Sequence, residues 1–222
     1  MRPPGTRTLA ALKAGVFALC LLPFVRLVWA AAAGALGANP VEAVTHSTGW
    51  WTLSFLCITL AITPLRRATK ANWLVKLRRM LGLYAFFYAS LHFTTYIWLD
   101  VWFDAAAIAK DIVKRPFITV GFTAFMLLVP LALTSTSAMQ RRLGRNWQRL
   151  HRAVYLVALL GVLHFWWLVK RDITEPALFA FVYLGLMALR VPRRTAARAA
   201  GRPRGREAAG GWAGAADRLP LR

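Results

Sequence analysis

Residues 150–169 read LHRAVYLVALLGVLHFWWLV. The run is as long as the roughly 20 residues that a helix needs to cross a hydrocarbon core of about 30 Å. It carries His151 near its start and His164 near its end. At a rise of about 1.5 Å per residue the two imidazoles lie about 20 Å apart along the helix axis. A buried imidazole in hydrocarbon needs a partner, so the segment predicts a membrane helix with a polar site toward each face.

The composition of the whole chain indicates a membrane protein. Of its 222 residues 58% are hydrophobic, and the mean hydropathy is +0.48. The net charge of +21 would suggest nucleic acid as the partner of a soluble protein. Here the basic residues fall in short clusters between long apolar runs, as they do in cytoplasmic loops of membrane proteins. We therefore expect membrane lipids and no nucleic acid as partners.

Six apolar segments predict an all-α integral membrane protein, a six-helix transmembrane bundle. The first resembles a secretory signal sequence in part, but it is too long for one and is expected to stay as a membrane helix. Residues 1–190 form the expected transmembrane domain. Residues 191–222 form a basic, Ala/Gly/Arg-rich tail that is expected to be disordered and cytoplasmic. The six segments are 14–36, 49–65, 80–99, 117–137, 150–169 and 176–190.

The distribution of charge among the loops predicts the orientation. Most Lys and Arg residues fall before the first segment, after the last, and in the second and fourth loops, whereas most acidic residues fall in the other loops. The positive-inside rule then gives an N-in/C-in, multi-pass membrane protein. In this orientation His92 and His164 lie toward the outer half of the membrane and His151 near the inner surface. His46 lies near the first outer loop, where Ser47 or Thr48 is expected to cap the second helix.

His92 and His164 are the candidate metal ligands. They occur at matching depths in the third and fifth segments, which predicts a haem held between these two helices as axial ligands of its iron. Two histidines would fill both axial positions, which favours single-electron transfer over substrate chemistry. The alternative is that each histidine hydrogen-bonds to a neighbouring helix. The aromatic residues near the pair are consistent with either interpretation: Phe86, Phe87, Tyr88, Phe93, Tyr96, Phe165 and Trp166.

The inner end of the bundle holds a second candidate site. Opposite His151 a second iron ligand would come from position 78, but Arg78 cannot offer a neutral nitrogen at ordinary pH. His151 therefore binds an inner haem with an unidentified ligand, contacts a quinone or flavin, or caps a polar interface. Arg78 and Arg79 either anchor the inner surface or bind a flavin phosphate or quinone carbonyl. Arg26, inside the first segment, either snorkels or pairs with a haem propionate.

From about residue 9 to residue 190 the chain resembles the MsrQ (formerly YedZ) family, within the wider ferric-reductase-like transmembrane group. Several stretches carry the resemblance, in order along the chain: Asn39-Pro40, Thr45-His46-Ser47-Thr48-Gly49, Arg78-Arg79-Met80-Leu81-Gly82-Leu83, His92, Lys114-Arg115-Pro116-Phe117, Leu133-Thr134-Ser135-Thr136, Trp147-Gln148-Arg149-Leu150-His151 and His164-Phe165-Trp166-Trp167.

The resemblance implies a b-type cytochrome subunit with one or two haems b. It would take electrons from the quinone pool, or from a flavin reductase through FMN, and pass them to a periplasmic molybdopterin-containing methionine sulfoxide reductase (MsrP-like) that repairs oxidised proteins. His92 and His164 match the outer haem ligands, and His151 matches a histidine of the inner redox site. Arg78 replaces the fourth histidine of the fuller pattern, which leaves the number of haems open.

No catalytic residue is expected in this chain, because the resemblance puts the catalytic chemistry in the partner subunit. Two other functions fit the same sequence. One is a stand-alone transmembrane ferric or quinone reductase. The other is a haem-free transporter or scaffold whose histidines move protons or metal ions.

Overall fold

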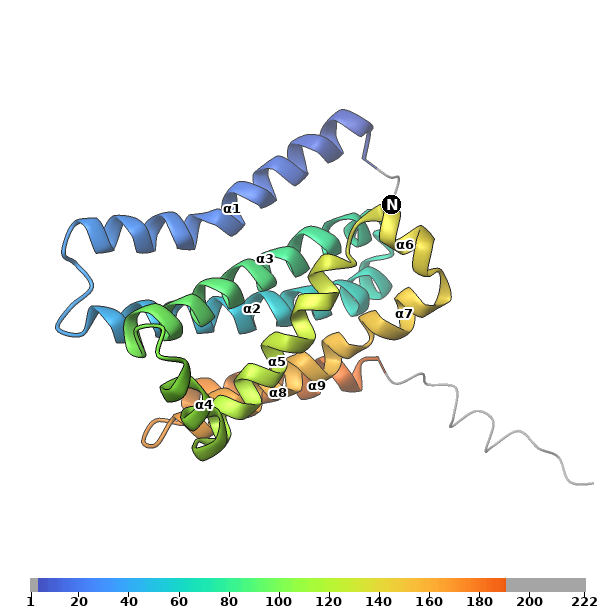
Figure 1. Ribbon diagram of the computed structural model, residues 1–222. Coiled ribbons are helices and arrows are strands. Elements are labelled where there is room, and N and C mark those ends of the chain that lie inside the picture. Colours follow the sequence, from blue (N-terminus) through green and yellow to red (C-terminus); the bar gives the residue numbers. More distant parts are fainter. Residues whose placement is uncertain (1–3, 191–222) are drawn as a thin grey trace, which may run out of the picture. The chain divides into compact units, whose positions relative to one another are not determined.

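A computed structural model describes residues 4–190, and the predicted tail 191–222 lies outside them. The described residues are helical and contain no strand (Figure 1). In chain order the helices are α1 (Thr6–Ala32), α2 (Pro40–Thr69), the 3₁₀-helix η1 (Asn72–Leu74), α3 (Val75–Thr95), the π-helical turn η2 (Tyr96–Asp100), α4 (Ala105–Lys114), α5 (Pro116–Leu133), α6 (Ser137–Leu143), α7 (Arg145–His151), α8 (Ala153–Leu168) and α9 (Thr174–Ala188).

Each of the six predicted segments contains a helix. Within residues 4–190, four stretches are long and apolar enough to cross a membrane: α1, α2, α5 and the run Arg145–Leu168 that joins α7 to α8. The apolar helix α9 is shorter, at 15 residues, and α3 begins with several basic residues. The count of six spans stays a prediction.

The start of α2 differs from the expectation. The helix begins at Pro40, well before the predicted residue 49, and the Asn39 side chain accepts a hydrogen bond from the Glu42 backbone N–H at 3.3 Å. Proline suits the first helical position because its missing N–H would have no partner there. His46 therefore lies inside the helix, and the cap expected from Ser47 or Thr48 is wrong.

The predicted fifth helix, 150–169, is also longer and less regular than expected. It starts at Arg145 and tightens at Arg152, where the Arg152 N–H donates to Arg149 O at 3.2 Å and Tyr155 N–H donates to Arg152 O at 3.1 Å. These short-range bonds divide α7 from α8. His151 and His164 thus belong to consecutive helices and not to one.

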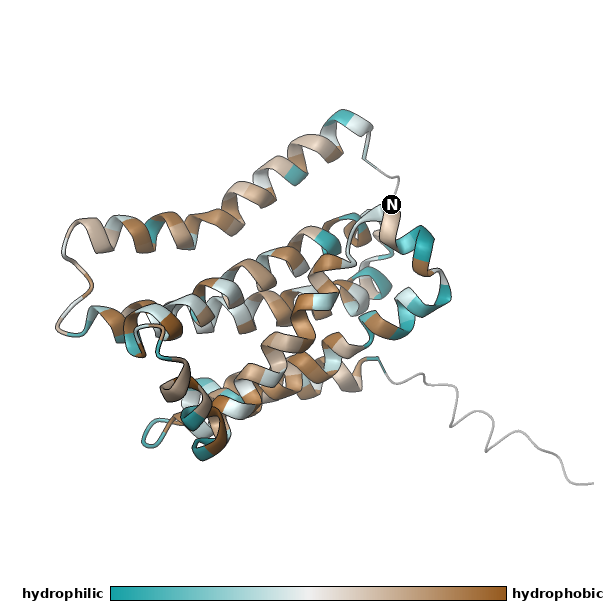
Figure 2. Cartoon of the chain, in the orientation of Figure 1, coloured by the Kyte–Doolittle hydropathy of each residue, from teal (hydrophilic) through white to brown (hydrophobic). Residues whose placement is uncertain are grey.

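Two helix pairs form the framework of the bundle. The helix α2 packs along α3, α5 packs along α8, and α9 contacts both α2 and α8. In Figure 1, α3 and α8 run in the same direction, toward the end that holds α4, while α6, α7 and the α2–α3 connection lie at the other end. Figure 2 shows hydrophilic residues gathered at these two ends and hydrophobic residues between them.

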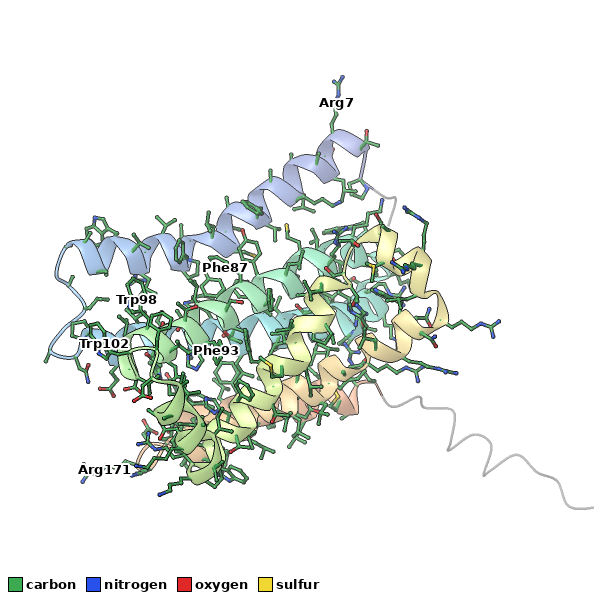
Figure 3. The ribbon with its side chains drawn as sticks, in the orientation of Figure 1. Arg7, Phe87, Phe93, Trp98, Trp102 and Arg171 are labelled. Atoms are coloured by element: carbon green, nitrogen blue, oxygen red, sulfur yellow. The ribbon has the colours of Figure 1, made fainter. Side chains whose placement is uncertain are left out.

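The helix α1 packs on α3 through aromatic side chains and is bent at its middle (Figure 1). Phe87 lies on the side of α3 that faces α1 (Figure 3). Its ring meets that of Phe24 edge to face, with centroids 5.3 Å apart. Pro23 interrupts the helical hydrogen bonds of α1. The Tyr88 hydroxyl accepts a hydrogen bond from the Phe24 N–H at 3.1 Å and donates one to Cys20 O at 2.9 Å. The Tyr88 hydroxyl from α3 is thus inserted between the backbone N–H of Phe24 and the carbonyl oxygen of Cys20 in α1. Such an insertion is a recognised cause of helix bending.

Candidate functional site

His92 on α3 and His164 on α8 face each other inside the bundle. Their ring centroids are 6.1 Å apart, and the ring planes are inclined by 80°. Both side chains are partly buried. The parallel course of the two helices brings these residues together, since each histidine lies near the same end of its helix (Figure 1).

Hydrogen bonds hold both rings in the same tautomer. The His92 Nδ1 lies 2.9 Å from Thr45 O, and the His164 Nδ1 lies 2.7 Å from Phe117 O. A carbonyl oxygen can only accept, so each Nδ1 carries the proton and donates it. The Nε2 of each neutral ring then keeps its lone pair, which is the arrangement found in metal-binding histidines.

The two histidines have equivalent surroundings. In each case the accepting carbonyl comes 47 residues before the histidine, on the helix packed beside it. In each case a glycine one helical turn after that carbonyl, Gly49 or Gly121, lies against the imidazole ring. Thr45, Gly49 and Phe117 belong to the motifs of the chain, but their contacts with the histidines were not predicted. The sequence feature that could have revealed these contacts is the spacing of 47 residues between carbonyl and histidine, which occurs once in each half of the chain.

Aromatic side chains join α3 to α5 next to His92 in the chain. Phe93 points from α3 toward α5 (Figure 3). It stacks on Phe125 with ring centroids 4.5 Å apart, and Phe86 stacks on Phe125 at 6.1 Å. The structure does not bring all the predicted aromatic residues here. Phe87 and Tyr88 point to α1, where they contact Phe24.

His151 lies in a different polar cluster. Its Nε2 is 3.2 Å from Thr134 Oγ1, and its ring stacks on Trp147 at 4.0 Å. The Thr134 hydroxyl donates to Pro130 O at 2.6 Å, so it accepts from His151 Nε2. The lone pair of a neutral His151 is therefore on Nδ1, the reverse of the arrangement at His92 and His164. Trp147 completes the cluster, since its indole N–H donates to Thr134 O at 2.9 Å.

The structure separates the two predicted arginines. Arg78 is partly buried and lies close enough to His151 and Arg190 for its charge to act on both. Arg79 is exposed. Of the two arginines, Arg78 is therefore the one whose charge acts on His151.

His46 lies on α2 next to Thr45, whose carbonyl accepts the His92 hydrogen bond, whereas Arg26 lies on α1. His46 Nε2 is 3.4 Å from Glu175 Oε2, which joins α2 to the start of α9, and both side chains are about half exposed. Its ring also meets Phe165 edge to face at 6.0 Å. Arg26 lines a cavity of about 540 Å³ between α1 and α2 together with apolar side chains, Ser47 and Trp51.

Comparison with known proteins gives the class of this arrangement. Residues 48–162, which run from the second helix through most of the eighth, match the model of the ferric reductase like transmembrane component family. The match includes His92 and His151 and ends just before His164. This match and the long apolar helices indicate a multi-pass membrane protein of this class. No solved structure matches the chain.

Relatives over nearly the whole chain identify the family more closely. The protein-methionine-sulfoxide reductase heme-binding subunit MsrQ of Herminiimonas arsenicoxydans is 55% identical over 191 residues, covering 85% of this chain and 88% of the relative. The MsrQ of Ralstonia nicotianae is 55% identical over 194 residues, covering 86% and 88%. The MsrQ of Bordetella pertussis is 50% identical over 202 residues, covering 88% and 98%. The chain belongs to the MsrQ family, which confirms the resemblance drawn from its motifs.

Proposed function

We propose that this protein is the haem-binding membrane subunit of a methionine sulfoxide reductase system. It passes electrons from the inner side of the membrane to a periplasmic molybdopterin-containing reductase, in which methionine sulfoxide is reduced. The observation that carries the proposal is the facing pair His92 and His164, with both Nδ1 atoms occupied and both Nε2 atoms free. The names of the relatives, which are heme-binding subunits, support it.

The dimensions of the pair fit one haem. An imidazole nitrogen binds a metal ion at about 2.0–2.1 Å, so two rings on opposite sides of one ion have centroids about 6 Å apart. The measured separation is 6.1 Å. Haem b held by two histidines would carry single electrons between its ferric and ferrous states, with no open position for substrate.

The protein's own residues would do three things at this site. His92 and His164 would bind the iron through Nε2. The carbonyl oxygens of Thr45 and Phe117 would orient the rings and increase the electron donation of each ligand. Phe93 and the aromatic residues beside it would keep water from the site.

The inner polar cluster is the proposed entry point for electrons. Arg78 supplies a positive charge beside His151, and both would bind a quinone carbonyl or the phosphate of FMN. Arg79 would add charge at the surface only. Binding of a second haem through His151 Nε2 would require release of the hydrogen bond from this nitrogen to Thr134. A single haem between α3 and α8 is therefore the simpler proposal.

The orientation in the membrane is part of the proposal. The N-terminus of α1, the α2–α3 connection, α6 and α7 lie at one end of the bundle (Figure 1), and these segments hold most of the basic residues in 4–190. The positive-inside rule assigns this end to the cytoplasm of a bacterial inner membrane. Six spans, N-in and C-in, would place the histidine pair on the periplasmic side.

An absorption spectrum with a pyridine haemochrome assay tests the function. The purified wild-type protein should show a Soret band that shifts on reduction, and one haem b per chain. His92→Ala and His164→Ala should each lose this haem, whereas His46→Ala should keep it because His46 is exposed and paired with Glu175. Full haem content in either of the first two variants, or a colourless wild-type protein, would refute the proposal.

A further inference from the structure

Two glycines touch the rings of the histidine pair. A Cβ atom added at Gly49 would lie 3.0 Å from His92 Cε1 and 3.1 Å from His92 Nδ1. A Cβ atom added at Gly121 would lie 2.6 Å from His164 Nδ1 and 2.8 Å from His164 Cε1. The distances at Gly121 are shorter than real Cβ contacts, so the imidazole must shift there, and the distances at Gly49 require a shift of a few tenths of an ångström. Alanine at either position would push the imidazole away from the helix.

Neither imidazole ring can move away from its glycine without weakening its Nδ1 hydrogen bond. Each Nδ1 hydrogen bond goes to the same helix as the glycine, at 2.9 Å for His92 and 2.7 Å for His164. Residues four apart lie on one face of a helix, so the accepting carbonyl and the glycine are neighbours along that face. A ring displaced by a methyl group would lengthen its hydrogen bond, rotate its plane, or do both.

Other helical glycines of the described residues lack this contact. A Cβ atom at Gly82 would meet its nearest neighbour, Thr59 Cγ2, at 3.9 Å, and one at Gly185 would meet nothing within 4 Å. The contact with an imidazole occurs at Gly49 and again at Gly121, with the same spacing to the carbonyl and to the histidine. The repetition links these two contacts to the histidine pair, whereas the other close contact of a helical glycine in the described residues, 3.2 Å from a Cβ atom at Gly161 to Leu53 Cδ1, is with an aliphatic side chain.

We infer that Gly49 and Gly121 are positioning residues, each of which lets an imidazole approach the neighbouring helix and donate Nδ1–H to its backbone. The inference rests on the proposed function for its effect on haem. The hydrogen bond makes the histidine a stronger electron donor to iron, and the glycine fixes the plane of the ring. Loss of either glycine should weaken haem binding and raise the midpoint potential of the haem that remains.

The test compares Gly49→Ala and Gly121→Ala with Gly82→Ala and Gly185→Ala in the full chain. Substitutions that disturb the hydrogen-bond partners of metal ligands typically lower metal affinity by about 10–100-fold. We expect losses of this size in the first two variants, larger for Gly121→Ala because its contact is shorter. The haem retained by Gly49→Ala should have an altered low-spin electron paramagnetic resonance spectrum and a higher potential. The two controls should match the wild type in all three measurements.

A double substitution gives a readout that does not depend on haem. In the His164→Ala background the ring is absent, so Gly121→Ala should no longer lower the thermal unfolding temperature, although it does so in the presence of His164. An equal loss in both backgrounds would overturn the inference, as would wild-type haem content, spectrum and potential in both glycine variants. A wild-type protein without haem would instead refute the proposed function and leave this stability comparison to decide the role of the glycines.

Discussion

The guanidinium of Arg190 donates a hydrogen bond to the carbonyl oxygen of Leu60, in the middle of α2. The helical donor for this oxygen would be the N–H of residue 64, but residue 64 is proline and has none. The same guanidinium donates to the Tyr155 hydroxyl and lies over the Tyr155 ring at 5.0 Å. Arg190 thus joins the end of α9 to α2 and α8.

Substitution of Arg190 should therefore lower stability. Arg190→Gln would leave the Leu60 carbonyl without a donor, at a cost of about 1–3 kcal/mol for a buried polar group. Thermal unfolding in detergent should show a clear decrease for this variant. Arg142→Gln is the matched control, since Arg142 is exposed on α6, and it should unfold at the wild-type temperature. Equal unfolding temperatures for the two variants would contradict the role of Arg190.

Two tyrosines of α3 that contact α1 should contribute unequally to the stability of the folded protein. Tyr88→Phe removes both the acceptor for Phe24 N–H and the donor to Cys20 O, and should cost about 0.5–1.5 kcal/mol for each hydrogen bond that is not replaced. Tyr84→Phe removes only a donor to Phe17 O. We expect thermal unfolding to rank wild type above Tyr84→Phe, and Tyr84→Phe above Tyr88→Phe. The reverse order would show that the bend of α1 does not depend on the Tyr88 hydroxyl.

The adjacent arginines Arg78 and Arg79 should have unequal effects on the proposed electron entry. A charge-assisted hydrogen bond is worth about 1.5–3 kcal/mol, so Arg78→Gln should weaken binding of reduced FMN or a quinol by about 10–100-fold. Arg79→Gln should change it by less than about fivefold, since an exposed cation contributes at most about 1 kcal/mol. The rate of haem reduction as a function of donor concentration measures this difference. Similar values for the two variants would place the donor elsewhere.

The His46–Glu175 pair should contribute little to stability. Exposed ion pairs are typically worth about 0–1 kcal/mol, and both side chains are half exposed. Glu175→Gln should therefore leave the unfolding temperature and the haem spectrum unchanged within error. A large loss of haem in this variant would show that the contact between α2 and α9 supports the histidine pair.

Much of this arrangement could be predicted because it depends on local properties of the chain. The length of the apolar runs predicts helices, and helices occur at all six predicted positions. The recurrence of histidine at the same place in two runs predicts that His92 and His164 meet. The start of α2 was missed because Asn39 and Pro40 form a cap within an apparently polar loop, a signal that apolar periodicity does not contain.

By itself, the sequence determined the class of protein, the family and the candidate ligands, because hydrophobicity, charge and motif spacing are carried by neighbouring residues. Only the tertiary structure decided which carbonyl each imidazole meets, that glycines lie against the two rings, that Arg78 is partly buried while Arg79 is exposed, and that Arg190 reaches the carbonyl freed by Pro64. These contacts join residues far apart in the chain. They depend on how the helices cross and on their register, which the packing of many side chains sets together.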